Sequence, residues 1–584
     1  MRARYVAATL LLLFAVLTLV DRFVLVELLV RRAGVPLLVA GAVALAAVGA
    51  GALARRGSRD LLLDFLIGYP LLGTACFVVG LAMVNVWTMW LVVIVLAALG
   101  ICLSVWKGAQ HAGSDGMGVR TRLTLPGGLS PTAAPSAWAF AVVAVIACGF
   151  VAAQAPPSSL DELAYHLAVP QAWVLEGRAV ELPLSSHSYF PLGIEAADLP
   201  GLALLGATGG GVASHLLHLF AAIATALLIA RYTQSWLATA AIVTTPALAI
   251  TAGWSLVDWP MAGLFVATWV AMQEDDLRTA SAATAAGLLT KYTFLPFAIV
   301  AWAWKRKRPH WIVLAGLVFF ARNLVLTLNP VAPFFSGDAP HVSGFRTLAL
   351  ADYVFDPLFV DEALGASLLA LPVFATGIVA LASAAIAIVL FFLGPSARIL
   401  VPYLVVPSLS GAAGLRKRWF AALVSIAVVV QTFLVIWFTA RSGAFALLAG
   451  SASEEEYLRR ARSNYGAVEW LNQAMPADAR ALVIGTGETY WFTRRVRGGG
   501  NFDGPRVSRY LDVPAPEALR TRLRGDGITH VVLVASDVRT RSARKREERQ
   551  MTLSPAAQRM LARTLDRYAA SVTSRGDATL FTLR

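Results

Sequence analysis

Long apolar stretches follow one another along the chain until about Arg441 and are separated by short polar connections. A helix needs about 20 mostly apolar residues to cross the hydrocarbon core of a bilayer. The pattern therefore predicts a polytopic α-helical membrane protein, with about 13 spans when broken and short helices are included. We expect these segments at residues 5–30, 34–53, 61–84, 87–106, 138–154, 212–230, 236–252, 258–272, 280–289 with 292–304, 311–328, 365–393, 399–415 and 419–440.

The composition supports this prediction. Of the 584 residues, 58% are hydrophobic and only 14% are charged, with a mean hydropathy of +0.67. A soluble domain carries about 25% charged residues, so much of this surface is expected to face lipid. The first apolar stretch continues past Asp21 and Arg22 into further apolar sequence, which indicates a retained helix and not a cleaved signal. The three cysteines lie inside apolar stretches, and we expect neither a disulfide framework nor a zinc site.

Beyond Arg441 the pattern changes to that of a soluble domain. Residues 454–471 have helical spacing, and residues 481–484, 531–534 and 579–583 are typical of short strands, so we expect a small α/β domain. Gly485 and Gly487 suit a tight turn better than a nucleotide site, and the charge run at 542–550 suits a solvated helix face or a mobile loop. The predicted division is 1–136, an N-terminal region of four spans; 137–440, the principal membrane region with a long loop at 156–200; and 441–584, the soluble domain.

Charge indicates partners and orientation. The net charge is +14, and the part from Arg441 onward holds 24 Lys and Arg against 15 Asp and Glu. On a membrane-anchored domain, this excess suits anionic headgroups or phosphorylated lipids better than nucleic acid. Basic residues mark the cytoplasmic side, which places the 156–200 loop outside. The C-terminal domain lies outside too if residues 365–393 double back as a hairpin, and inside if they cross once. The basic residues are Arg2, Arg4, Arg55, Arg56, Arg59, Lys107, Arg120, Arg122, 305–308 and 416–418.

The start of the 156–200 loop carries the most informative chemistry. Asp161 and Glu162 are adjacent carboxylates at the membrane surface, where unpaired charge is costly and often functional. A carboxylate of this kind suits proton abstraction from a hydroxyl group. Ser159 and Glu162 also have the spacing of a capping box, which is a purely structural interpretation. In a helix, Asp161 would align with Tyr165 and Glu162 with His166.

These residues belong to an ordered series of motifs that resembles the GT-C glycosyltransferases, in the style of the protein mannosyltransferase and aminoarabinose transferase branch. The resemblance covers residues 138–441 and 465–484 and leaves out the first four spans. One position departs from the pattern, since Ile399 replaces an aromatic residue. The motifs are Asp161-Glu162, Tyr165-His-Leu167, Pro170, Leu-Glu-Gly-Arg at 175–178, Ser188-Tyr-Phe-Pro191, Asp258, Thr290-Lys-Tyr292, Ala321-Arg-Asn323, Asn329-Pro-Val-Ala-Pro-Phe334 and Arg398 with Leu400-Val-Pro402.

The resemblance implies an inverting enzyme that takes a sugar from a polyprenyl-phosphate donor in the inner or plasma membrane, with its site and C-terminal domain on the outer side. Asp161 and Glu162 would be catalytic, with Asp161 as the base. Asp258 would hold the acceptor or, with Asp161, a divalent cation. Substrate-binding roles would fall to cations that neutralise the departing phosphate and to neighbouring residues. They are Lys291, Arg322, Arg398, Tyr165 and His166. Membrane lipids and an acceptor of unread chemistry complete the expected partners, without nucleic acid.

Structural interpretations stand beside these roles. Lys291 lies in a broken helix, where it would either line a polar cavity or snorkel to the interface. Arg322 and Arg398 would serve as interface anchors, Asp258 as a helix cap ahead of Pro260. His166 and His187 suit interface positions, and Glu195 and Asp198 suit a solvated helix start. The competing functions are a transporter or lipid flippase, and a polysaccharide-assembly protein without transferase activity.

Overall fold

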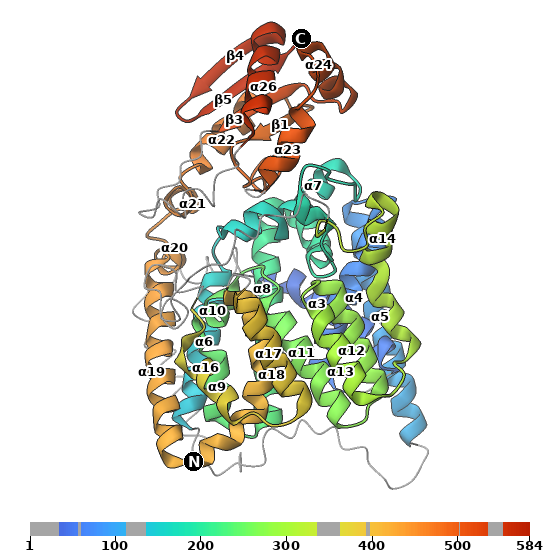
Figure 1. Cartoon of the computed structure of the whole chain (residues 1–584), viewed down its shortest axis with the longest axis vertical. Coiled ribbons are helices and arrows are strands. Elements are labelled where there is room, and N and C mark those ends of the chain that lie inside the picture. The colour runs from blue at the N-terminus through green and yellow to red at the C-terminus, as the bar shows by residue number, and fades with distance from the viewer. Residues whose placement is uncertain are drawn as a thin grey trace.

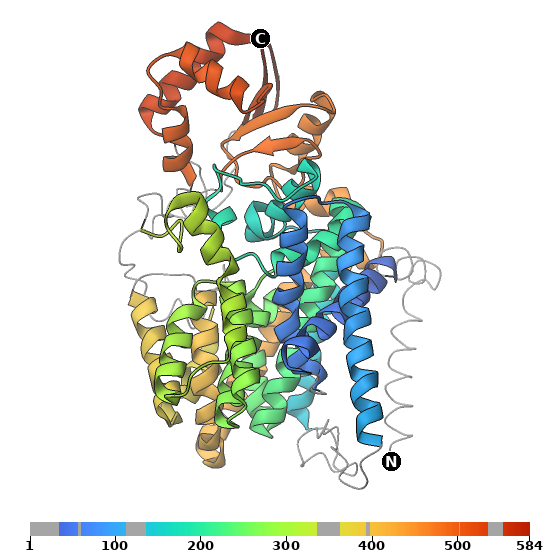
Figure 2. The ribbon, with the colours of Figure 1, turned by 90° about the vertical axis from the view of Figure 1, so that its right-hand side faces the viewer.

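The computed structural model describes residues 34–56, 60–112, 136–335, 363–392, 397–500, 503–534 and 553–584. The first predicted span, 5–30, and the charge run at 542–550 lie outside these ranges. A helical bundle makes up most of the described chain, and a small α/β domain stands on one end of it (Figure 1 and Figure 2).

Membrane-length helices dominate the bundle. The described residues contain six helices long and apolar enough to cross a membrane, or seven if the bent pair at 236–253 counts as one span, together with five shorter apolar helices. The predicted polytopic helical fold is confirmed. The helices are α3 (Val35–Ala54), α4 (Leu61–Gly80), α5 (Val86–Ala112), α6 (Ala137–Ala153), α8 (Leu199–Thr233), α9 (Trp236–Val243), α10 (Pro246–Ala249), η5 (Ile250–Gly253), α11 (Asp258–Gln273), α12 (Leu277–Thr290), α13 (Phe294–Lys305), η6 (Trp311–Leu317), α14 (Val318–Thr327), α16 (Gly365–Ala370), η8 (Leu371–Phe374), α17 (Ile378–Phe392), α18 (Ala397–Gly411), η9 (Ala412–Arg416) and α19 (Arg418–Arg441).

The N-terminal helices are part of the same core as the helices that follow them. A Cβ at Gly68 of α4 would lie 1.7 Å from the carbonyl oxygen of Ala47 in α3, so only glycine permits this approach. Small residues at such crossings are typical of membrane helix packing, because they let backbones come close. Gly73 of α4 meets the carbonyl of Gly193 in the same way, which presses α4 against the 156–200 segment. The N-terminal region, which lies outside the GT-C resemblance, therefore packs directly against the segment that carries the acidic motif.

Residues 365–392 double back, which settles the alternative left open by the sequence. At the turn between η8 and α17, the Thr376 backbone N–H donates to Ser410 Oγ at 2.9 Å, near the end of α18. Farther along α17, Ser383 Oγ donates to the Tyr403 carbonyl at 2.7 Å, closer to the start of α18. The α17 and α18 helices are thus antiparallel. The α16–η8 segment runs parallel to α18, because Ser408 Oγ donates to the Leu368 carbonyl at 3.5 Å and a Cβ at Gly411 would lie 2.0 Å from the Leu371 carbonyl. The two short segments therefore form a hairpin, and the C-terminal domain lies on the side of the 156–200 loop.

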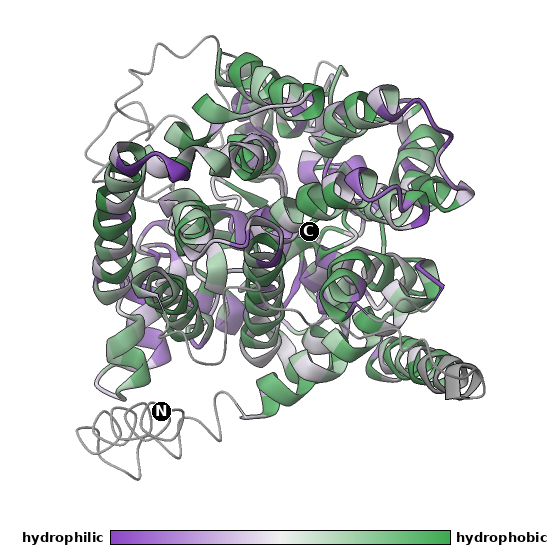
Figure 3. Cartoon of the chain, turned by 90° about the horizontal axis from the view of Figure 1, so that it is seen from below, coloured by the Kyte–Doolittle hydropathy of each residue, from purple (hydrophilic) through white to green (hydrophobic). Residues whose placement is uncertain are grey.

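Polar connections gather at the end of the bundle opposite the C-terminal domain. Here Arg231 at the end of α8 pairs with Asp60 at 2.7 Å, and Arg278 donates to the carbonyl of Ala54 at 2.9 Å. Lys305 and Lys307 both contact Asp275 in the turn after α11. Figure 3, seen from this end, shows hydrophilic connections and largely hydrophobic outer helices, as expected for a lipid-facing surface.

The C-terminal domain is built on a five-stranded mixed sheet in the order β2-β1-β3-β5-β4. Strands β1 and β3 are parallel, whereas β5 runs antiparallel to β3 and β4. Alternate residues of β1 face two cores, because Leu482 packs with one set of helices and Val483 with the other. The elements are α20 (Ala444–Leu448), α21 (Glu454–Ala461), α22 (Tyr465–Ala474), β1 (Arg480–Ile484), β2 (Arg495–Arg497), α23 (Gly504–Leu511), α24 (Pro516–Gly525), β3 (His530–Val534), α26 (Pro555–Tyr568), β4 (Ala569–Arg575) and β5 (Ala578–Leu583).

The three predicted strands of this domain are found, and two others were missed. β2 has only three residues, and β4 is exposed along most of its length, so neither has a clear apolar pattern. The expected helix at 454–471 is divided into α21 and α22 by the turn at 462–464. Gly485 has a φ of +97°, which only a glycine tolerates beside the carbonyl of Val534, and this fits the expected turn.

Candidate active site

The acidic motif lies on a short helical turn between α6 and α7 (Ala168–Glu176). Residues Glu162–His166 form a π-helix, closed by a bond from the Leu167 N–H to the Glu162 carbonyl at 3.0 Å. Because a π-helix turns more widely than an α-helix, the expected alignment of Asp161 with Tyr165 and of Glu162 with His166 is wrong. Glu162 instead contacts His215 Nε2 at 2.7 Å, and His166 Nδ1 contacts Glu195 Oε1 at 2.7 Å. Single-turn π-helices occur frequently at functional sites.

Asp161 and Asp258 converge on one guanidinium. Arg398, near the start of α18, pairs through Nη2 with Asp161 Oδ2 and through Nη1 with Asp258 Oδ2, the latter at 3.6 Å. Lys291 is the extended residue that separates α12 from α13, and its charge acts on Asp161. The structure thus brings together four of the predicted site residues, from four separate segments of the chain.

The charge state of Asp161 follows from these neighbours. Burial alone would raise the pKa of Asp161, but the Arg398 guanidinium, aided by Lys291, outweighs burial and holds this pKa below its usual range. The side chain of Asp161 is 29% exposed, so the carboxylate remains open to a partner from outside the protein. Asp161 is therefore an ionised, partly accessible carboxylate at a membrane boundary.

Glu162, the second expected catalytic residue, is engaged by groups of the protein itself. Its side chain is fully buried, and its oxygens accept bonds from His215 Nε2, the Ser255 N–H at 2.6 Å and the Ser159 N–H at 2.9 Å. Burial would raise the pKa of Glu162, but His215 and the two N–H groups lower it. The Ser159 bond is the backbone half of the predicted capping box. Glu162 thus fixes the turn that carries Asp161, which is a positioning role.

Aromatic rings cover one side of the acidic turn. Tyr165 packs against His166, with ring centroids 4.0 Å apart, and stacks on His187 at 4.4 Å. Phe190 continues the row, 5.0 Å from His187 and 5.8 Å from Phe334. Burial lowers the pKa of both histidines, so both rings are neutral at pH 7. His166 was expected either to bind substrate or to lie at the interface, and His187 to lie at the interface; the structure places both rings beside the acidic turn.

Glu195 and Asp198 are buried, which corrects the prediction of a solvated helix start. Each is only 3% exposed, in the 3₁₀ turn that leads into α8. Among the described residues, Glu195 Oε2, Asp198 Oδ1 and His218 Nε2 are buried without a hydrogen-bond partner. Buried polar atoms of this kind are usually satisfied by internal water. One feature of the sequence could have indicated a buried polar cluster here. His215 and His218 lie three residues apart inside an otherwise apolar helix.

Arg322 does not join the acidic cluster. Its Nη2 donates to the Ser188 carbonyl at 2.9 Å and to Asn323 Oδ1 at 2.8 Å. The guanidinium also lies over the Phe319 ring, 5.2 Å from the centroid. Arg322 therefore anchors the 188–190 segment, and its expected phosphate contact stays a prediction.

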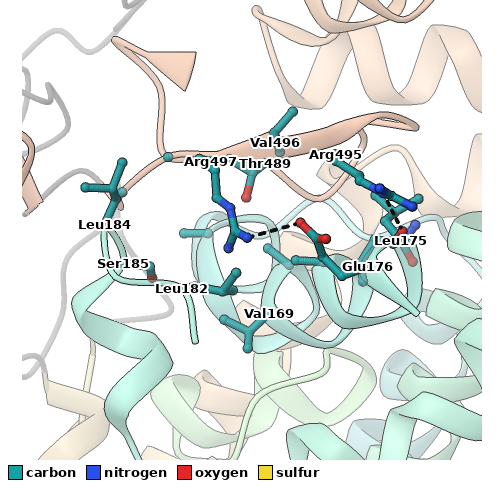
Figure 4. A pocket seen from close by; sticks show the side chains of 16 residues that line it. Val169, Leu175, Glu176, Leu182, Leu184, Ser185, Thr489, Arg495, Val496 and Arg497 are labelled. Carbon is teal, nitrogen blue, oxygen red and sulfur yellow. Dashed lines mark hydrogen bonds and ion pairs between the residues drawn. The ribbon is translucent and has the colours of Figure 1, made fainter. Parts of the chain in front are cut away.

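The C-terminal domain contacts the loop that carries the acidic turn (Figure 4). Glu176 pairs with Arg497 at 3.3 Å and with Arg480 at 2.8 Å, both from the C-terminal sheet. Arg495 Nε donates to the Leu175 carbonyl at 3.2 Å. A small cavity of about 30 Å³ remains between the two surfaces. The junction is thus a packed interface.

A second contact reaches the acidic turn itself. The backbone N–H of Thr489 donates to the Leu163 carbonyl at 2.9 Å, and Tyr490 OH donates to the Ala207 carbonyl. Ser158 accepts a bond from Arg462 Nε at 2.6 Å and shares one with Tyr457 OH at 3.0 Å. Nothing in the sequence indicated that the C-terminal domain would contact the acidic turn and hold it in position.

The two acidic residues do not fit a metal site as arranged. Arg398 already occupies the position between the carboxylates that a divalent cation would need. Across the described ranges, no group of three or more His, Cys, Asp or Glu side chains has an arrangement that could hold a metal ion. The positive charge beside Asp161 and Asp258 comes from the protein itself.

Comparison with known proteins gives similarity at the level of solved structures. No protein-family model matches the sequence, and no curated protein matches it. The chain is similar to ArnT from Cupriavidus metallidurans bound to undecaprenyl phosphate, at 14% identity over 76% of this chain and 96% of that one, with a TM-score of 0.45. The apo state of ArnT gives 14% identity, 76% and 97% coverage and a TM-score of 0.44. At this identity and TM-score, the likeness assigns no role to any residue.

Proposed function

We propose that this protein is an inverting glycosyltransferase that moves a sugar from a polyprenyl-phosphate donor to an acceptor hydroxyl. The observation that carries the proposal is the pairing of Asp161 and Asp258 on Arg398, next to Lys291. An ionised carboxylate supplies a base, and adjacent cations suit a phosphate leaving group. The order of the GT-C-like motifs along the chain supports the same function.

The reaction assigns one task to each group. Asp161 takes the proton from the acceptor hydroxyl while that oxygen forms a bond to the anomeric carbon of the sugar. The bond between the anomeric carbon and the phosphate oxygen breaks, and its electron pair leaves with the lipid phosphate. Arg398 and Lys291 neutralise the charge that develops on this phosphate. Attack from the face opposite the leaving group inverts the anomeric configuration.

The contact between Arg398 and Asp161 adds a condition to this reaction. A carboxylate whose pKa is held low is a weak base, so Asp161 is poorly active while it is paired with Arg398. A donor phosphate would compete for the same guanidinium and weaken that pairing. The basicity of Asp161 would then rise only when the donor is bound, which protects the site from reacting without its substrate.

We place the site on the outer side of the membrane. Basic residues at the opposite end, among them Arg231, Arg278 and Lys305, support this orientation. In a variant with all three cysteines replaced by serine, Arg178→Cys should react with an impermeant thiol reagent in intact cells, whereas Arg308→Cys should not. Both positions are exposed, and the reverse labelling would invert the orientation.

The proposed reaction is tested with the purified full-length chain in liposomes. The substrates are polyprenyl-phosphate-linked glucose, mannose and arabinose, each with a radiolabelled sugar, and cell-envelope extract supplies the acceptor. We expect the chain to convert one donor to free polyprenyl phosphate and to transfer label to an acceptor. If the folded protein consumes none of the three donors, the result counts against the proposal.

A further inference from the structure

A polar groove lies in the C-terminal domain between α22 and the turn that joins β4 to β5. Its volume is about 480 Å³, within the range of about 300–1,000 Å³ typical of small-molecule sites. No role in the proposed chemistry involves this groove. Its principal polar and aromatic lining comes from Arg459, Asn464, Glu469, Trp470, Gln473, Arg575 and Asp577.

The lining is chemically mixed and nearly balanced in charge. Arg575 and Asp577 are exposed at the turn, and Arg459 pairs with Glu469 at 2.5 Å on the α22 side. Arginine only donates hydrogen bonds, carboxylates only accept them, and amides do both. Sugar hydroxyls also donate and accept, so they satisfy such a set, whereas a phosphate or an anionic headgroup would require an excess of positive charge. Trp470 adds an aromatic surface of the kind that packs against apolar faces.

The wall of the groove is continuous with the contacts that hold the acidic turn. Asn464, in the lining, donates through Nδ2 to Thr486 Oγ1 at 3.1 Å. Arg462, two residues earlier, pairs with Glu488 at 3.3 Å and donates to the Ser158 carbonyl at 2.6 Å. Ser158 stands three residues before Asp161. An occupant of the groove therefore lies beside the chain segment that positions the proposed base.

We propose that this groove binds a neutral oligosaccharide segment of the acceptor, so that the acceptor is a glycan chain. The inference rests on the proposed transfer for the role of the ligand, and on the groove alone for its chemistry. Size, mixed donors and acceptors, and balanced charge favour a polyhydroxylated neutral ligand. The link through Arg462 places it on the side of the domain that contacts the acidic loop.

The test is binding by the full chain in lipid nanodiscs, without any donor lipid. The probes are neutral hexasaccharides of glucose, mannose, galactose or arabinose, followed by saturation-transfer NMR. We expect at least one hexasaccharide to bind, and the double variant Arg575→Gln with Asp577→Asn to weaken that binding about tenfold, the loss of roughly one to two hydrogen bonds. Both residues are exposed, so the variant should fold normally.

The matched control is Arg563→Gln with Asp566→Asn on α26, which removes the same charges from an exposed surface outside the groove. Its binding should equal that of the wild type. The inference is overturned if none of the four probes binds, or if the groove variant binds as tightly as the wild type. Because the measurement needs no turnover, a wild-type chain that binds a hexasaccharide but consumes none of the three donors would sink the transfer proposal and leave the glycan groove standing.

Discussion

Asp161 and Asp258 share the guanidinium of Arg398, although they lie on the 156–200 segment and at the start of α11. The arrangement couples the proposed base to a second carboxylate through one cation. Any ligand that draws Arg398 toward itself changes both carboxylates at once. Arg398 is therefore the residue at which binding of an anionic donor and activation of the base would meet.

Replacing Arg398 should change both the rate and its pH dependence. We expect Arg398→Gln to lower kcat/KM about 10²–10³-fold, because a cation facing the phosphate is lost. In the wild type, the low pKa of Asp161 keeps the base ionised, so the acid limb of kcat/KM should lie below pH of about 4. In Arg398→Gln burial is no longer opposed by this cation, and the limb should move to higher pH.

The control is Arg398→Lys, which keeps the charge and should retain more of the rate and an acid limb closer to that of the wild type. An acid limb at the same pH in all three proteins would show that Arg398 does not control the protonation of Asp161.

The hydrogen bonds that the Glu162 carboxylate accepts should contribute to the stability of the fold. Glu162→Gln replaces one accepting oxygen with an amide group, so one of its buried bonds is lost, and we expect about 1–3 kcal/mol of destabilisation at pH 7. The pKa of Glu162 is lowered in the folded chain, so this contribution is present above the unfolded value of about 4.3 and is lost as pH falls through the folded value.

The measurement is thermal unfolding in detergent from pH 7 downward. Glu274→Gln, on an exposed turn, is the matched control and should be neutral. Equal melting temperatures for Glu162→Gln and Glu274→Gln at pH 7 would contradict the positioning role.

Glu176 should couple the C-terminal domain to the acidic loop. Glu176→Gln weakens two ion pairs, to Arg480 and Arg497, and because the arginines are partly exposed we expect a loss of only about 1–2 kcal/mol. Hydrogen exchange should speed up at residues 158–176. The control is Glu517→Gln, which weakens a pair with Arg567 on the exposed face of the same domain. Unchanged exchange in Glu176→Gln would mean that the docking does not stabilise the loop.

Much of the fold follows from patterns within single segments. The positions of most helices, the break at Lys291 and the strands β1, β3 and β5 are each encoded by their own apolar spacing. The α8 helix departs from its prediction, because it begins at Leu199 and not near residue 212. The hairpin at 365–392 was left open because its two halves are shorter than a full crossing, and only contacts with α18 decide between the alternatives. β4 was missed because an exposed edge strand lacks an apolar face.

The site shows the limit of local patterns more clearly. Asp161, Asp258, Lys291 and Arg398 were found through their motifs, and the structure brings them together. Glu162 and Arg322 belong to the same motifs, yet each is occupied by partners distant in sequence. Burial of Glu195 and Asp198 depends on α4 pressing against their turn. Contacts of this kind have no signature in the chain segment that makes them.

The most direct measurement of the central claim is sugar transfer by Asp161→Asn in liposomes, with thermal unfolding and polyprenyl-phosphate binding followed on the same preparation. Asparagine keeps the shape of the side chain but cannot accept the acceptor proton. The account predicts a loss of about 10²–10⁴-fold in transfer, with the protein folded and lipid binding retained. Near-normal turnover by Asp161→Asn would contradict it and would leave Asp161 as no more than the structural partner of Arg398.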